Sequence, residues 1–461
     1  MKLQILDRAV QDVLQKICDE NASDQFYVDD TQTITYADFY LRLTECLERL
    51  QSRGVTKSAI VVVKGEFVID SIIVLIALVA NGNIVIPHTP ASYEKLKLET
   101  DLLSPDFLID GTVQPFSCTK TGISETSCLA DSFDAGERGL VVFSSGSTGR
   151  PKAIVHKVDP LLEKFATRGN KKLRAIPFLL FDHMGGFNTL LSILYGGGCI
   201  VYRKERSVDS ICAAIEKFNV TLLPATPTFL AMLLVSDAWK TYNLSSLRMI
   251  TYGTEVMNEV ILRKLASVLP DVRFKQTYGL SEVGVLMTTS RGNDNTWVKL
   301  SGDDLQTKVV DDILWLKVKS AMLGRVFYED DEARFEAHQA EWFCTNDIVE
   351  VDEEYLRFCG RDTDIINVSG LKVYPGEIEN CLLECNQIVN AAVFGKRNPL
   401  VGQIVVAEIE LKPDADESNA KQEIQRHCSD HLDRYKVPRE ITFVDRIAVT
   451  DRLKKRRITD A

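Results

Sequence analysis

The stretch AIVVVKGEFVIDSIIVLIALVANGNIVI, residues 59–86, decides the fold class. Its two ends, Ala59 to Val63 and Ile84 to Ile86, are short apolar runs typical of buried strands. Between them, Phe67 to Ala80 is an apolar segment of helical length that contains Asp70 and is too short to span a membrane. A strand, a helix and a second strand in this order predict a βαβ unit, and therefore a parallel sheet covered by helices.

Other parts of the chain repeat this alternation of helices and strands. Thr35 and Asp38 have the spacing of a capping box, so we expect a helix that begins there and ends at Gly54. Val220 to Leu223 and Leu247 to Thr251 are apolar runs of strand length, and each leads into a polar loop. The βαβ pattern therefore recurs, which predicts further parallel strands covered by helices.

The sequence changes in character after about residue 300. Short β-rich runs follow, such as Ile313 to Val318, and a smaller α+β segment begins after Gly360. We therefore predict an α/β protein with two domains. The large N-terminal domain, residues 1–360, has parallel-rich sheets packed by helices and a β-rich end, and a small, mobile α+β C-terminal domain covers residues 361–461.

The composition argues against several classes of protein. The chain has 54 basic and 65 acidic residues and a net charge of -11, which argues against general binding to nucleic acid or anionic membranes. Its 11 cysteines lack CxxC spacing and its N-terminal segment lacks an apolar signal core, so we expect reduced thiols and a cytoplasmic location. The chain has only 6 histidines, and we expect no catalytic zinc.

The sequence SSGSTGRPK, Ser144 to Lys152, follows the apolar run Leu140 to Phe143 and is rich in hydrogen-bond donors. Its small side chains, hydroxyl groups and backbone N–H groups suit close wrapping of phosphate oxygens, and Lys152 adds a positive charge. An ordinary solvated turn has a similar composition, so composition leaves both interpretations open. A P-loop of the Walker type is disfavoured because two residues separate Gly149 from the lysine.

This loop resembles the phosphate-loop signature of the adenylate-forming superfamily, which comprises acyl- and aryl-CoA synthetases, adenylation domains of peptide synthetases, and luciferases. Further segments match motifs of this family, in the family's order, over nearly the whole chain. They are IVIP at 84–87, PATPT at 224–228, YGTE at 252–255, QTYGLSE at 276–282, TND at 345–347, GRDTD at 360–364 and YKVP at 435–438.

The resemblance implies an ATP-dependent reaction in two steps. A carboxylate attacks the α-phosphate of ATP to give an acyl-adenylate and pyrophosphate, and a thiol then takes the acyl group. The implied cofactors are ATP and Mg2+, with coenzyme A (CoA) or phosphopantetheine as the acyl acceptor. The implied partners are a small carboxylic acid and, for phosphopantetheine, a separate acyl carrier protein, because we expect a freestanding enzyme. We expect no nucleic-acid partner.

The resemblance also implies the residues that hold the nucleotide. Tyr278 would stack on adenine, Asp347 has the paired acceptors that two ribose hydroxyls need, and the carboxylate of Glu282 would hold Mg2+. Glu255 is equally well explained as a solvated loop acid, and Arg361 as a surface ion pair. The implied nucleotide-binding residues are Ser144, Ser145, Gly146, Ser147, Thr148, Gly149, Lys152, Gly253, Thr254, Glu255, Tyr278, Gly279, Ser281, Asp347 and Arg361.

Some positions depart from the family's usual residues. Asn346 replaces the glycine of a Thr-Gly-Asp triplet, which asparagine tolerates if the backbone there is left-handed. Thr363 stands where the family usually has Asp or Lys, at the hinge between the two domains.

The basic tail VTDRLKKRRITDA, residues 449–461, contains the catalytic lysine that the resemblance implies. Counting from Pro438 places Leu453 at a position where the family has glycine. The same count makes Lys454 the lysine that reaches the α-phosphate and the substrate carboxylate, a role that suits a long, mobile side chain with a point charge. The neighbouring Lys455 is the alternative, and a solvated basic tail is another.

The segment FDHMGG, residues 181–186, corresponds to the acyl pocket of the family. We place His183, Gly185 and Gly186 in that pocket, as in ligases of fatty or aryl acids. In the other register, Asp182 is the aspartate with which amino-acid-activating relatives hold an α-amino group. This register makes a freestanding amino-acid-activating enzyme the first alternative. The departures at Asn346, Thr363 and Leu453 leave a non-catalytic nucleotide- or acyl-binding relative as a second alternative, and the basic tail leaves a protein that binds nucleic acid as a third.

Overall fold

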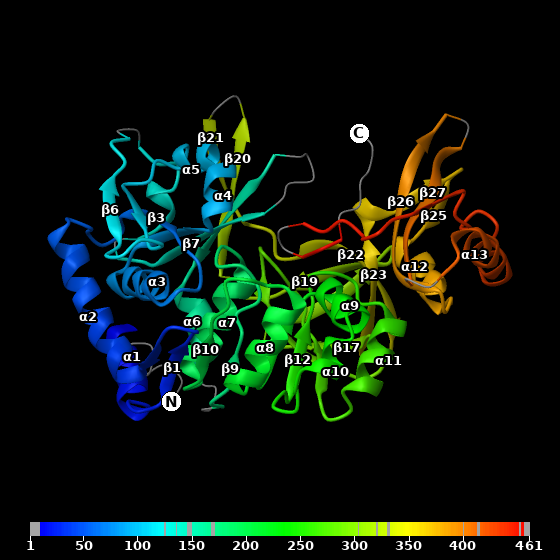
Figure 1. The fold of residues 1–461 in the computed structure, drawn as a ribbon. Coiled ribbons are helices and arrows are strands. Elements are labelled where there is room, and N and C mark those ends of the chain that lie inside the picture. The colour runs from blue at the N-terminus through cyan, green and yellow to red at the C-terminus, as the bar shows by residue number, and fades with distance from the viewer. Residues whose placement is uncertain are drawn as a thin grey trace.

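The computed structural model describes residues 10–123, 126–134, 136–144, 150–166, 171–302, 304–319, 321–329, 332–399, 401–412, 415–450 and 453–455. These residues form a large domain, residues 10–361, and beside it a small domain, residues 362–455 (Figure 1). The small domain is coloured orange to red, and its final segment runs back towards the middle of the large domain.

The first part of the large domain contains the predicted βαβ unit. Its strands β3 and β4 are parallel and belong to an eight-stranded sheet in the order β21-β20-β8-β7-β4-β3-β5-β6 of the described residues. The helix between them, α3 (Ile69–Asn81), is apolar on all sides and almost wholly buried, as expected of a helix that covers a sheet. The strands are β3 (Ile60–Lys64), β4 (Ile84–His88), β5 (Phe107–Asp110), β6 (Ser117–Lys120), β7 (Gly139–Ser144), β8 (Lys152–Lys157), β20 (Met322–Glu329) and β21 (Glu332–Ala337).

Helix α2 (Tyr36–Ser52) packs against α3 and confirms the predicted capping box. The Thr35 side chain accepts from the Asp38 amide, and the Asp38 carboxylate accepts from the Thr35 amide at 3.1 Å. The helix ends at Ser52, and Gly54 follows with a positive φ of 81°. The capping box and Gly54 therefore predicted the start and the end of this helix to within two residues.

The second part of the large domain is a seven-stranded sheet in the order β13-β12-β11-β9-β10-β1-β2 of the described residues, and only the pairing with β2 is antiparallel. The carboxyl ends of β11 and β12 lead directly into the PATPT and YGTE segments, as predicted from the two strand-like runs. The strands are β1 (Gln25–Val28), β2 (Thr33–Thr35), β9 (Arg174–Ala175), β10 (Cys199–Val201), β11 (Leu222–Ala225), β12 (Met249–Tyr252) and β13 (Arg273–Gln276).

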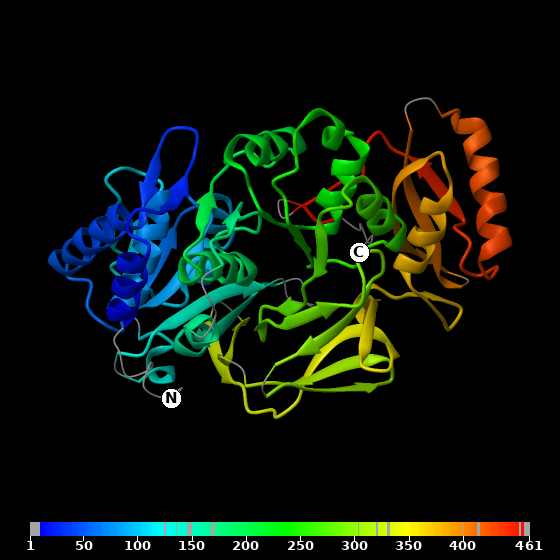
Figure 2. The ribbon, with the colours of Figure 1, turned by 90° about the horizontal axis from the view of Figure 1, so that it is seen from below.

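Helices cover these two sheets in the views of Figures 1 and 2. They are α1 (Val10–Glu20), α4 (Pro90–Lys95), α5 (Lys97–Asp101), α6 (Asp159–Ala166), α7 (Met184–Tyr195), α8 (Val208–Phe218), α9 (Pro227–Val235), α10 (Ala238–Thr241), α11 (Glu259–Val268) and the 3-10 turn η1 (Ala130–Ser132).

The β-rich end of the large domain is a six-stranded antiparallel sheet in the order β16-β17-β23-β22-β19-β18 of the described residues. It follows the short hairpin of β14 and β15 and confirms the prediction of a β-rich segment after residue 300. The strands are β14 (Gly279–Leu280), β15 (Gly284–Val285), β16 (Met287–Ser290), β17 (Trp297–Ser301), β18 (Gln306–Val310), β19 (Ile313–Lys317), β22 (Phe343–Asp352) and β23 (Tyr355–Arg361).

The small domain begins with the 3-10 turn η2 (Asp362–Asp364) and has its own sheet, seen at one side in Figure 2. Strand β23 runs to Arg361, so the chain leaves the large domain one residue past the predicted boundary, which stays a prediction. The elements are β24 (Ile366–Val368), β25 (Leu371–Val373), α12 (Pro375–Glu384), β26 (Ile388–Asn398), β27 (Gly402–Leu411), α13 (Glu417–His431) and β28 (Glu440–Phe443).

The two domains share a continuous hydrophobic cluster. It joins Phe229 and Leu262 of the large domain to Ile378 and Val393 of the small domain, and helix α11 lies against α12. This packing holds the small domain beside the carboxyl ends of the seven-stranded sheet, where open α/β sheets bind their ligands.

Candidate functional site

The loop after β12 is fixed by close packing and by hydrogen bonds. A Cβ atom on Gly253 would lie 2.6 Å from the Thr277 carbonyl oxygen, so only glycine fits there. Thr254 has a positive φ of 72°. The Glu255 carboxylate accepts from the Thr228 hydroxyl at 2.8 Å, which ties the YGTE segment to the PATPT segment. Glu255 is therefore an anchored residue and not a solvated loop acid.

Three predicted nucleotide residues meet in one hydrogen-bonded group, in which Tyr278 and Asp347 are buried. The Tyr278 hydroxyl donates to Asp347 Oδ2 at 2.6 Å, and Arg361 Nε donates to Asp347 Oδ1 at 3.2 Å. Burial raises the pKa of the Asp347 carboxyl, while Arg361 and Tyr278 oppose that shift. The Phe358 ring stacks on Tyr278 with ring centroids 4.3 Å apart. Adenine would therefore have to stack on the other face of the Tyr278 ring.

Asn346 has a left-handed backbone, with φ of 56°, as its replacement of glycine requires. The neighbouring residues fix this turn. The Thr345 hydroxyl donates to the Leu314 carbonyl at 2.7 Å and accepts from the Asp347 amide at 3.0 Å. The local fold therefore accommodates the departure from the Thr-Gly-Asp triplet and still presents the Asp347 carboxylate.

The phosphate-loop segment joins two antiparallel strands. Ser144 pairs with Lys152 at the end of the β7–β8 ladder, and the predicted residues Ser145, Gly146, Ser147, Thr148 and Gly149 lie outside the described residues. No helix follows the loop, as one would in a Walker P-loop, because β8 begins at Lys152. Arg150 donates to the Tyr328 carbonyl at 3.2 Å and lies 3.9 Å from Glu99, so it is held against the protein.

The residue predicted to hold the metal, Glu282, lies on the QTYGLSE segment. Glu282 Oε1 is 3.5 Å from Arg325, and both side chains are partly exposed. Within the part of the chain that the structure describes, no group of three or more His, Cys, Asp or Glu side chains could hold a metal ion. A single carboxylate suits Mg2+, which keeps water and phosphate oxygens as its other ligands, so Glu282 fits a metal bound chiefly by nucleotide phosphates.

A residue that the sequence analysis missed supports this segment. His156 on β8 is fully buried, and its Nε2 donates to the Ser281 carbonyl at 2.7 Å. Burial lowers the pKa of His156 to about 4, so the ring is neutral, and its Nδ1 atom has no hydrogen-bond partner among the described residues. The available signal was a single histidine in an apolar strand four residues after Lys152, a pattern that usually indicates a core residue.

The tail docks on both motif loops of the seven-stranded sheet. The Thr226 hydroxyl donates to the Leu453 carbonyl at 2.8 Å, and the Lys455 amide donates to Glu255 Oε1 at 2.8 Å. Leu453 has a positive φ of 51°, a conformation that glycine adopts without cost, so it matches the family's glycine position. Lys454 lies between these two anchored residues.

The side chain of Lys455 is turned into the small domain. Its ammonium group donates to the Ala391 carbonyl at 2.7 Å and pairs with Glu379 at 3.2 Å, where the two side chains are only 13% and 8% exposed. An ammonium held in this way is not available to a substrate. Of the two candidates, Lys454 is therefore the better placed for the catalytic role.

The FDHMGG segment begins helix α7. His183 is the N-cap residue, and its Nδ1 accepts from the Gly185 amide at 3.0 Å. A Cβ atom on Gly186 would lie 2.1 Å from the Leu180 carbonyl oxygen, and one on Gly185 would lie 2.5 Å from Leu179 Cδ1. These two glycines permit close packing of the chain on itself. Their place in the acyl pocket stays a prediction.

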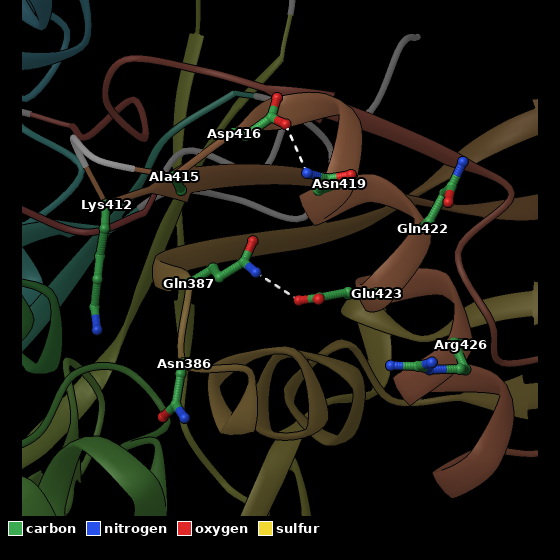
Figure 3. A pocket seen from close by; sticks show the side chains of 9 residues that line it. All are labelled: Asn386, Gln387, Lys412, Ala415, Asp416, Asn419, Gln422, Glu423 and Arg426. Atoms are coloured by element: carbon green, nitrogen blue, oxygen red, sulfur yellow. Dashed lines mark hydrogen bonds between the residues drawn. The ribbon is translucent and has the colours of Figure 1, made fainter.

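A cavity of about 710 Å³ lies elsewhere, in the small domain between α13 and the ends of β26 and β27 (Figure 3). Its lining side chains bond to one another, as in the pairs Gln387–Glu423 and Asn419–Asp416. It contains none of the predicted site residues. The lining residues are Asn386, Gln387, Lys412, Ala415, Asp416, Asn419, Gln422, Glu423 and Arg426.

Comparison with known families agrees with the geometry of the site. Residues 107–313 match the model of the AMP-binding enzyme family, and residues 377–454 match the model of the AMP-binding enzyme C-terminal domain. Together these matches cover more than half of the chain, and they include the motif loops, Tyr278 and the tail. The chain belongs to the AMP-binding enzyme family. The predicted adenylate-forming family and its class of acid–thiol ligases are thereby confirmed.

Relatives within the family are CoA ligases. The chain is 27% identical over 381 residues to the indoleacetate–CoA ligase of Aromatoleum aromaticum, covering 75% of this chain and 73% of that protein. It is 27% identical over 384 residues to the long-chain-fatty-acid–CoA ligase of Haemophilus influenzae, covering 80% and 67%.

A solved structure, the anthranilate CoA ligase AuaEII in complex with anthranoyl-AMP, matches with a TM-score of 0.78 and 19% identity over 97% of this chain and 95% of that chain. At that identity the match shows the shared fold. Among the helices of the described residues, none is both long enough and apolar enough to pass through a bilayer.

Proposed function

We propose that this chain uses ATP and Mg2+ to convert a carboxylic acid into an acyl-adenylate, and that it then transfers the acyl group to the thiol of CoA. One observation supports the proposal. Two hydrogen bonds, from Thr226 to Leu453 and from Lys455 to Glu255, hold the tail on the PATPT and YGTE loops, and Lys454 lies between the two bonded tail residues.

The first step joins two anions, so the enzyme must position them and stabilise charge. One carboxylate oxygen attacks the α-phosphorus, the bond from that phosphorus to the bridging oxygen breaks, and pyrophosphate leaves with the electron pair. Lys454 would lie on the α-phosphate and the acid, while Lys152 and the hydroxyl and N–H donors of residues 144–149 would hold the departing phosphates. Mg2+, held by Glu282, would neutralise part of the charge on the pyrophosphate.

The nucleoside is assigned to the group built around Asp347. The Asp347 carboxylate would accept hydrogen bonds from the two ribose hydroxyls. Its present hydrogen bonds to Tyr278 and Arg361 would have to rearrange when the nucleotide binds. Thr254, Gly253 and Gly279 would border adenine, and Ser281 would donate to a phosphate oxygen.

The second step replaces the mixed anhydride of the acyl-adenylate by a thioester. The thiol sulfur attacks the acyl carbon, the carbon–oxygen bond to AMP breaks, and the thiol proton leaves to solvent. We favour CoA as the acceptor because the related proteins reported above are CoA ligases. A carrier-protein phosphopantetheine arm is the alternative acceptor. The 11 cysteines, which are all free thiols, suit the reducing cytoplasm, where we place this enzyme.

The acid is proposed to be a fatty or aryl acid. A second candidate, an acid that carries an amino group, is favoured by one observation: Asp182 is 5% exposed, and its Oδ1 has no hydrogen-bond partner among the described residues. A buried acceptor without a partner is costly, and an ammonium group on the substrate would satisfy it.

Exchange of labelled pyrophosphate into ATP tests the function. The panel should contain matched pairs of acids that differ only in an amino group, such as 3-phenylpropanoate and phenylalanine. Exchange with the plain acid supports the first candidate, and exchange with only the amino acid supports the second. Tight ATP binding without pyrophosphate exchange for any acid would indicate a non-catalytic nucleotide-binding protein of the family.

CoA and a phosphopantetheine-bearing carrier protein are then compared as acceptors by mass spectrometry of the acylated product. Deleting the basic tail should not change retention of the protein on immobilised nucleic acid.

A further inference from the structure

The tail is fixed to both domains at a single residue, Lys455. Its backbone amide donates to Glu255 of the large domain at 2.8 Å, and its ammonium group donates to the Ala391 carbonyl of the small domain at 2.7 Å. The same ammonium pairs with the Glu379 carboxylate at 3.2 Å. Lys455 therefore joins the two domains directly next to Lys454.

The contact inside the small domain is deeply buried. The side chain of Lys455 is 13% exposed and that of Glu379 is 8% exposed. The other oxygen of Glu379 accepts from the Val393 amide at 3.1 Å, which holds the carboxylate on β26. Burial of a charge pair gives little net stability because both groups lose their hydration, so such a pair is better explained by the geometry that it imposes.

The contact on the large domain also involves a carboxylate that accepts two hydrogen bonds. Glu255 Oε1 accepts from the Lys455 amide, while Oε2 accepts from the Thr228 hydroxyl at 2.8 Å. Thr226, two residues earlier, donates to the Leu453 carbonyl. The residues before and after Lys454 are thus bound to the two motif loops, and the small domain cannot rotate away without breaking these bonds.

We propose that Lys455 is a positioning residue: its ion pair with Glu379 locks the tail into the domain arrangement in which Lys454 reaches the reacting groups of the adenylation step. The effect of this ion pair on catalysis rests on the proposed function. It acts on adenylation alone, because an acyl-adenylate that is already formed no longer needs Lys454 at the α-phosphate.

The main experiment separates the two half-reactions in Lys455→Met. Methionine keeps a long unbranched side chain and removes the ammonium. We expect pyrophosphate exchange to fall about 10- to 100-fold, as misplacement of a reacting group does. Acyl transfer from the supplied acyl-adenylate to CoA should stay within about 2-fold of wild type. Lys455→Arg should recover part of the exchange rate, since it retains the charge.

Two further variants control for damage to the fold. Lys396→Met removes another lysine–glutamate pair of the small domain, with Glu440 at 2.9 Å, and should leave both half-reactions unchanged. The double variant Lys455→Met with Glu379→Gln removes the buried carboxylate left unpaired by the single change. It should regain the melting temperature of the wild type without regaining exchange.

Three results would overturn the lock: unchanged exchange in Lys455→Met, an equal fall of both half-reactions, or recovery of exchange in the double variant. If the wild type shows no pyrophosphate exchange with any acid, the proposed function fails, and amide hydrogen exchange of residues 449, 450 and 453–455 then tests the lock separately. Protection lost in Lys455→Met and kept in Lys396→Met supports it, and protection kept in both overturns it.

Discussion

His156 gives the sharpest quantitative prediction about this protein. The ring is fully buried, and burial lowers its pKa from the ordinary value of 6.5 to about 4. We expect His156→Gln to make the protein less sensitive to acid. Glutamine does not titrate, and its side-chain amide can still donate a hydrogen bond to the Ser281 carbonyl.

The direction and magnitude of the change in the free energy of unfolding follow from proton linkage. Below pH 6.5 the unfolded chain takes up a proton on this histidine, whereas the folded protein does so only near pH 4. As far as His156 is concerned, the free energy of unfolding is therefore highest above pH 6.5 and decreases as the pH falls towards 4. At about pH 5 the loss due to His156 amounts to about 2 kcal/mol. His88, whose pKa burial also lowers to about 4, contributes in the same direction in both proteins and cancels in the comparison.

The assay is urea unfolding of wild type and His156→Gln at about pH 7.5 and about pH 5, followed by circular dichroism. The difference in free energy of unfolding between the two proteins should change by about 2 kcal/mol between these conditions, in favour of the variant at low pH. A difference that stays constant within about 0.5 kcal/mol would show that His156 does not titrate as a buried neutral group. His156→Leu, which also removes the bond to Ser281, should in addition lower pyrophosphate exchange.

Three further predictions concern the nucleotide side of the site. Asn346→Ala should lower the free energy of unfolding by about 1 kcal/mol, because the backbone there is left-handed, while Asn346→Gly should be neutral; equal melting temperatures of the two variants would contradict this. Tyr278→Phe should cost about 1.5–3 kcal/mol of stability through the lost bond to the buried Asp347 carboxylate, and calorimetry measures it. Asp347→Asn should weaken ATP binding about 10-fold or more by titration calorimetry, while Asp352→Asn, on an exposed ion pair, should not; unchanged affinity in Asp347→Asn would remove the ribose assignment.

Local patterns in the sequence predicted much of the fold. The βαβ unit at residues 59–86, the capping box of α2 and the strands that lead into the motif loops are all present. Each depends on residues close together in the chain, where apolar periodicity and capping preferences act directly. The left-handed backbone at Asn346 belongs to the same class, because a short polar residue in place of glycine indicates a positive φ.

Other features depend on residues far apart in the sequence. His156 and Ser281 are 125 residues apart, and the packing around Gly186 involves a carbonyl oxygen rather than an open pocket. A histidine in an apolar strand and a pair of glycines have several structural explanations, and the choice among them is made by neighbours that only the folded chain provides.

The tail shows most clearly which features the sequence predicts and which ones only the tertiary structure decides. The sequence by itself determined the adenylate-forming family, because the family motifs occur in order along the chain, and it predicted a catalytic lysine in the tail. Counting from Pro438 favoured Lys454 but left Lys455 as an alternative, since two adjacent cations of the same type have the same local chemistry. Only the tertiary structure gave the two lysines different surroundings, by burying the Lys455 ammonium against Glu379 and binding its amide to Glu255, 200 residues away. The physical reason is that a lysine's role depends on which acceptors the fold brings within hydrogen-bonding distance.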